Sequence, residues 1–135
     1  MNEVEVKQGL FYIHKSDHRD SSPRKSQWRI SELEERNSFV LMYDAPWHTN
    51  YRGWSLHIKG KAAHYLGINA LKNRNLIIAK FIDGNQNNIW HGYPADYVQD
   101  HRECPSIEIL TAWKEKGHFS RAKIRKIIRG QPCSL

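Results

Sequence analysis

The basic side chains of this chain gather in one short segment near its C-terminus. Residues 111–130 hold seven Lys and Arg against one acid, Glu115, which is a surplus of six charges in a chain of net charge +7. Concentrated positive charge on one small element favours a polyanionic partner, most commonly nucleic acid. Arg121, Arg125 and Arg129 recur every fourth residue, the spacing that aligns side chains along one ridge of a helix. We expect this ridge to contact phosphates, because a guanidinium binds phosphate bidentately.

The two helices expected here, with the turn Gly117–Ser120 between them, loosely resemble a helix-turn-helix over about 25 residues. Trp113 is bulky near where that motif favours a small residue, and no Asn or Gln accompanies the basic side chains. Base edges are typically read by such amides, so we expect contacts to the phosphate backbone rather than sequence-specific reading. The candidate nucleic-acid-binding residues are Arg121, Lys123, Arg125, Lys126 and Arg129, with Trp90 and Tyr93 as aromatic rings that could stack on bases.

A second group of residues with chemical potential spans 90–97, where a strand is expected to end at His91 and a loop to follow. His91 and Asp96 form a candidate catalytic pair, because His titrates near neutrality and a carboxylate can orient it. His57 and His64 would add titratable groups if they lie close in space. The alternative interpretation is structural: Gly92 and Pro94 set the direction in which the chain leaves the strand, and Trp90 and Tyr93 pack against neighbouring side chains.

Metal and covalent chemistry have less support. The side chains of types that suit zinc are His91, Asp96, Asp100, His101 and Cys104. Their spacing matches no strong zinc motif, so we expect no metal and no cofactor. Neither Cys104 nor Cys133 has the sequence context of a catalytic thiol. The sequence contains no Walker A, dinucleotide-binding or classical hydrolase motif.

Length and composition indicate one folded domain, residues 1–135, with a strand-rich body (1–100) and a helical hairpin (105–130). Aromatic residues make up 11% of the chain, which argues against a disordered tail, because disordered segments contain few aromatic residues. No apolar run approaches the ~20 residues needed to span a bilayer, so we expect no membrane partner. The N-terminal residues do not have the pattern of a signal peptide, and we expect a cytoplasmic location with both thiols free.

Hydrophobic periodicity indicates the elements that must position these residues. Strands are expected at 10–14, 38–43, 54–59, 76–82 and 89–91, with a turn at 83–88 that makes the last two a hairpin. Loops are expected at 15–27 and 44–53. Ser31 and Glu34 have the form of a capping box, but for a very short helix, and residues 61–72 indicate another short helix.

Two C-terminal helices have clearer boundaries. Ser106 and Ser120 are suited to N-caps, and Gly117 and Gly130 to helix ends. The sequence therefore predicts an α+β fold: a small antiparallel sheet of about four to five strands followed by a C-terminal helical hairpin.

Three functions remain open from the sequence alone. The leading hypothesis is nucleic-acid binding, to DNA or RNA, through phosphate contacts from the basic helix. The second is a small nuclease or phosphoesterase that uses His91 and Asp96, and the third is a protein-interaction module that docks an acidic partner. The oligomeric state is open.

Overall fold

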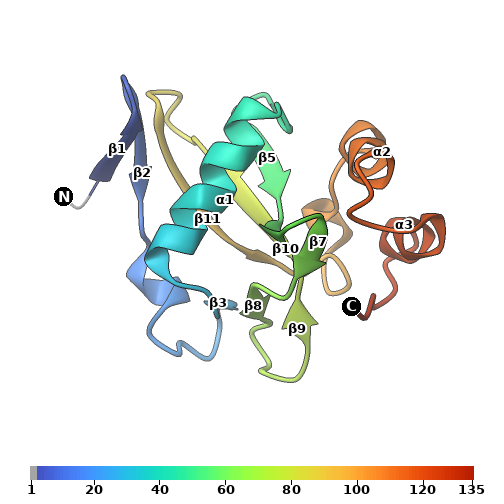
Figure 1. Cartoon of the computed structure of the whole chain (residues 1–135). Coiled ribbons are helices and arrows are strands. Elements are labelled where there is room, and N and C mark those ends of the chain that lie inside the picture. The colour runs from blue at the N-terminus through green and yellow to red at the C-terminus, as the bar shows by residue number, and fades with distance from the viewer. Residues whose placement is uncertain (1–2) are drawn as a thin grey trace.

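A six-stranded mixed sheet forms the centre of the molecule, in the order β1-β2-β11-β10-β5-β4 (Figure 1). The computed structural model describes residues 3–135. Neighbouring strands are antiparallel except β2 and β11, which run parallel. The strand bounds are β1 Glu3–Lys7, β2 Leu10–Ile13, β4 His48–Thr49, β5 Arg52–Ser55, β10 Ile78–Ile82 and β11 Ile89–Ala95. The predicted α+β class is confirmed, while the sheet is larger than expected and contains one parallel pair.

The hairpin of β10 and β11 confirms the predicted strands and turn around residues 83–88. Asp83 holds the turn, because its buried carboxylate accepts the backbone N–H groups of Asn87 and Asn88 at 3.2 and 2.8 Å. β11 continues to Ala95, so the loop predicted after His91 is wrong, and Pro94 lies inside a strand. Pro94 suggests the end of a strand, but β11 stays paired with β10 at Pro94 and Ala95.

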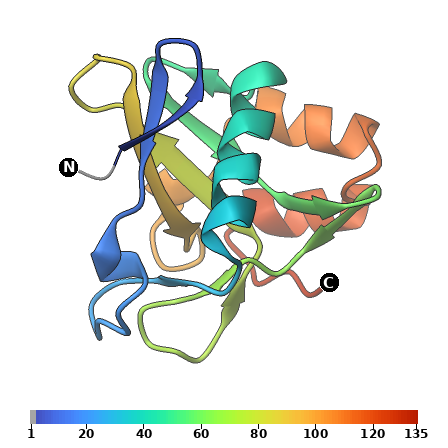
Figure 2. The same cartoon turned by 60° about the vertical axis from the view of Figure 1, so that its left-hand side comes forward.

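Helix α1 (Glu32–Asp44) lies across one face of this sheet (Figures 1 and 2). The predicted capping box is present, since Ser31 accepts the N–H of Glu34 and Glu34 accepts the N–H of Ser31. The helix is not short, however, and the buried strand predicted at 38–43 is its second half. Phe39 and Met42 are fully buried whereas Leu41 is exposed, which is helical periodicity.

Close approach of α1 to the sheet depends on two glycines that flank Phe81 on the neighbouring strands. Gly53 and Gly92 pair with Phe81 from β5 and β11. A Cβ at Gly92 would lie 2.2 Å from the Phe81 ring, and one at Gly53 would lie 2.3 Å from Met42 Sδ. The missing side chains leave room for Phe81 and Met42 in the core between α1 and the sheet.

Two small sheets complete the body. One has the order β3-β8-β9, with bounds Gln27–Trp28, Gly67–Ile68 and Asn75–Leu76, and the other pairs β6 His57–Lys59 with β7 Ala62–His64. The helix predicted at 61–72 is therefore wrong, because Gly60 at φ +66° turns the chain into a hairpin and Gly67 pairs with Trp28. The strand predicted at 54–59 is divided between β5 and β6. The loop at 15–27 contains a short 3-10 helix, η1 (Ser16–His18).

The C-terminal helical hairpin is confirmed. After the 3-10 helix η2 (His101–Glu103), α2 spans Ile107–Glu115 and α3 spans Arg121–Ile128. Ser106 and Ser120 cap them by accepting the N–H groups of Ile109 and Lys123. Trp113 and Ile127 are fully buried where the hairpin meets the body. Across residues 3–135, no helix is long and apolar enough to traverse a bilayer.

Candidate functional site

Helix α3 presents its cationic side chains to solvent. Its apolar face is anchored, since Ile124 is 7% exposed and Ile127 is fully buried. We call the remaining surface the basic face of α3; it consists of Arg121, Lys123, Arg125, Lys126 and Arg129. Lys123 is half-buried, and the other four side chains are exposed. The predicted ridge of three arginines is therefore accessible along the helix.

The positive charge of this face is not neutralised by neighbouring acids. Within residues 3–135, no Asp or Glu side chain lies within 4.0 Å of a cationic group of the basic face, although nine ion pairs occur elsewhere. The first turn of α3 carries no acidic residue, so the positive end of the helix dipole adds to the charge of Arg121. Such a surface gains free energy when it meets an external polyanion.

The two aromatic residues proposed to stack on bases lie on opposite faces of β11, because side chains alternate along a strand. Trp90 is 3% exposed and packs edge-on against Tyr43 in the core, with ring centroids 6.2 Å apart. Tyr93 is half-buried, donates its hydroxyl to Glu103 at 2.8 Å and stacks on His18. Burial removes Trp90 from any accessible surface, and Tyr93 already has both its ring and its hydroxyl engaged.

The structure does not bring His91 and Asp96 together. They are five residues apart on and beyond β11, which corresponds to about 16 Å at the rise of an extended strand. The carboxylate of Asp96 instead pairs with Arg74. Burial, and then the nearby charge of Lys15, lower the pKa of His91. The charges of Asp17 and Asp83 act on His91 more weakly. Within residues 3–135 no carboxylate lies within 4.0 Å of its ring nitrogens, whereas the catalytic hypothesis requires one.

Other candidate groups are placed as follows. His57 and His64 do meet across the β6–β7 hairpin, with ring centroids 6.2 Å apart. The part of the chain that the structure describes contains no group of three His, Cys, Asp or Glu side chains that could hold a metal ion. Cys104 and Cys133 are half-buried, and burial raises the pKa of both thiols, which disfavours the nucleophilic thiolate.

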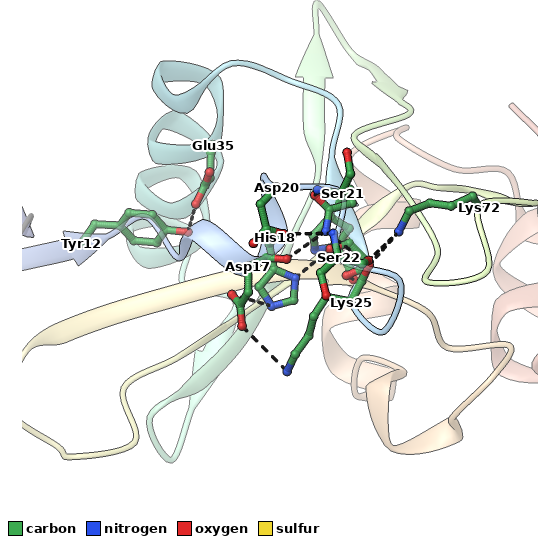
Figure 3. A network of polar contacts seen from close by, with 12 residues as sticks. Tyr12, Asp17, His18, Asp20, Ser21, Ser22, Lys25, Glu35 and Lys72 are labelled. Carbon is green, nitrogen blue, oxygen red and sulfur yellow. Dashed lines mark hydrogen bonds and ion pairs between the residues drawn. The ribbon is translucent and has the colours of Figure 1, made fainter.

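A buried polar cluster that the sequence did not reveal forms around Glu35, whose side chain is 0% exposed. Glu35 extends from α1 to the hydroxyl of Tyr12 on β2 (Figure 3). Its Oε1 accepts from Nε and Nη2 of Arg19, at 3.1 and 2.8 Å. The available signal was positional: Glu35 falls four residues before Phe39 on the buried stripe of α1, and a charged residue there demands partners.

His14 and Arg36 extend this cluster toward the surface. Nδ1 of His14 lies 3.1 Å from Glu35 Oε1, without hydrogen-bond geometry. Nη1 of Arg36 lies 3.0 Å from Nε2 of His14. Because a guanidinium only donates, Nε2 must accept, and the network assigns the ring hydrogen of His14 to Nδ1, facing Glu35.

Two groups of cationic side chains therefore stand out in the fold: the basic face of α3 and the cluster around Glu35. They lie on different sides of the molecule, since η1, which Arg19 directly follows, is at the lower left and α3 on the right in both views (Figures 1 and 2). Comparison of the chain with protein-family models, curated proteins and solved structures finds no match.

Proposed function

We propose that this protein binds nucleic acid through phosphate contacts from the basic face of α3. The observation that carries the proposal is a helix with four exposed cationic side chains and no acid within ion-pair distance in residues 3–135. Each phosphate neutralised by such a side chain releases condensed counterions, which is the main source of sequence-independent affinity.

The composition of α3 favours the phosphate backbone over base edges. Its sequence from Arg121 to Ile128 contains no Asn or Gln, the side chains that read adenine, and its arginines recur once per turn along a single ridge. Ile124 and Ile127 anchor α3 to the body, so the surface that α3 presents to a partner consists mainly of the basic side chains, with Ile128 (39% exposed) beside them. Aromatic stacking by Trp90 has no place in this proposal, because that ring is in the core.

The proposal is tested by fluorescence anisotropy with labelled single- and double-stranded oligonucleotides across a salt series. The variant replaces Arg121, Arg125 and Arg129 with Gln. We expect the slope of log K against log salt to become shallower by about 2.7 for duplex DNA, at ~0.9 per phosphate contact, or about 2.1 for single strands, at ~0.7. The affinity of this variant for the oligonucleotides should also be lower than that of the parent.

A matched control variant removes three positive charges from another part of the surface, at Arg24, Arg29 and Lys59. These side chains are exposed, and no acid of the described chain lies within 4.0 Å of them. This variant should keep the slope of the parent. Equal slopes for the α3 variant and the parent, or no binding by the parent at low salt, contradict the proposal.

The competing function, docking of an acidic protein, uses the same face and is separated by the choice of polyanion. Poly-glutamate presents carboxylates without phosphates or bases. Nucleic-acid binding predicts that oligonucleotides bind more tightly than poly-glutamate of equal charge, because a guanidinium forms bidentate contacts with phosphate and the charge density of nucleic acid is higher. Tighter binding of poly-glutamate favours the acidic protein partner instead.

A further inference from the structure

A cavity of about 480 Å³ opens beside the cluster around Glu35, between the end of β2, η1 and the first turns of α1. Its volume falls in the range of small-molecule sites. The charged and titratable side chains in its wall are His14, Lys15, Arg19, Asp20, Glu32 and Arg36. They come from three separate segments of the chain, which the buried Glu35 network holds together.

Arg19 and Arg36 both line the cavity, and hydrogen bonds to Glu35 and His14 hold them in place. The side chain of His14 is only 10% exposed and that of Arg19 is 22% exposed. A guanidinium has five N–H groups. Arg19 donates two of its N–H groups to Glu35, which leaves three for a ligand. Arg36 donates one N–H group to His14, which leaves four.

The cationic and the acidic side chains of the cavity wall differ in their ion pairing and in their exposure. Arg36 and Lys15 have no acid within 4.0 Å among residues 3–135. Asp20 and Glu32 are exposed, and Asp20 accepts the backbone N–H of Ser22 in its own loop. Half-buried charges interact more strongly with a ligand than exposed ones, because water screens them less. Arg19 and Arg36, which are half-buried, therefore dominate the recognition of a ligand, and the exposed Lys15 adds a positive charge at the rim of the cavity.

We propose that this cavity binds a small molecule through a phosphate or carboxylate group, held by Arg36, Arg19 and Lys15. The fixed Glu35 orients the Arg19 fork through Nε and Nη2 and faces Nδ1 of His14, so the donors are set before the ligand arrives. A bound anion accepts hydrogen bonds from the remaining N–H groups of Arg36 and of Arg19. The site is independent of α3 and lies on a different side of the fold.

The test is isothermal titration calorimetry of the full chain with inorganic phosphate, adenosine monophosphate and citrate, and with adenosine as the uncharged control. We expect binding of at least one anion and none of adenosine. The double variant Lys15→Gln/Arg36→Gln should raise the Kd at least tenfold. Preference for adenosine monophosphate or for citrate identifies the group that the site recognises.

Two further variants distinguish binding in this cavity from a loss of fold and from binding to α3. Lys15→Glu changes only an exposed side chain, so it keeps the fold and should also weaken binding. The Arg121/Arg125/Arg129→Gln variant should bind the small anions as the parent does, although it loses affinity for oligonucleotides. Absence of heat with all three anions at millimolar concentration, or equal Kd values for Lys15→Glu and the parent, overturns the proposal and leaves the function of α3 unaffected.

Discussion

The buried carboxylate of Glu35 permits the most direct test of what holds the N-terminal half of the fold together. Glu35→Gln keeps the size of the side chain and removes its charge, which leaves the Arg19 guanidinium without its counter-ion. Breaking a buried ion pair in this way costs about 3–5 kcal/mol. The Arg19 side chain is 22% exposed and can be partly rehydrated, so we expect the lower end, about 3 kcal/mol. At ~3–4 °C per kcal/mol for a chain of this size, Tm should fall by about 10 °C.

Urea unfolding followed by tryptophan fluorescence, with calorimetry for Tm, measures this loss. Glu32→Gln is the matched control, because Glu32 is exposed on the same helix, and its effect should stay within about 0.5 kcal/mol. The double variant Arg19→Met/Glu35→Met removes both charges and should be more stable than Glu35→Gln, since an apolar pair leaves no buried charge behind. A Glu35→Gln protein as stable as the parent would refute the reasoning.

Two more predictions concern the sheet. Gly92→Ala should destabilise by about 3 kcal/mol or more, because the new Cβ would lie 2.2 Å from the Phe81 ring and 2.7 Å from the Lys80 carbonyl oxygen; the urea midpoint measures it, and an unchanged midpoint contradicts it. His91 has its pKa lowered chiefly by burial, so the unfolded chain takes up the proton more readily. The stability that this shift contributes is present above about pH 6.5 and lost as pH falls. His91→Gln should therefore flatten the fall of Tm between about pH 6.5 and 5, and an unaltered acid limb contradicts this.

Local sequence signals were sufficient to define the C-terminal helical hairpin of this protein. Ser106 and Ser120 cap α2 and α3, and Trp113 and Ile127 mark their buried sides. These signals are local, because caps and helical periodicity act within one or two turns. The β10–β11 hairpin was equally readable, since the turn and its flanking strands are contiguous. The cationic composition of α3 also follows from the sequence.

Elements whose state depends on distant partners took their form only in the folded molecule. A short apolar run such as 38–43 fits a buried strand or a buried helix, and α1 prevails because Phe39 and Met42 meet the Gly53–Phe81–Gly92 face of the sheet. Residues 61–72 become β7 and β8 because partner strands are available, which overrides their helical composition.

The accessibility of each candidate site residue was also a tertiary outcome. Whether Trp90 faces the core or solvent depends on which side of the sheet α1 covers, and Asp96 is engaged by Arg74 from another part of the chain. The cluster around Glu35 joins residues 23 positions apart, Tyr12 and Glu35. No local pattern encodes such a contact, because the free energy that fixes it arises only when the helix packs on the sheet and the buried charge must find its partners.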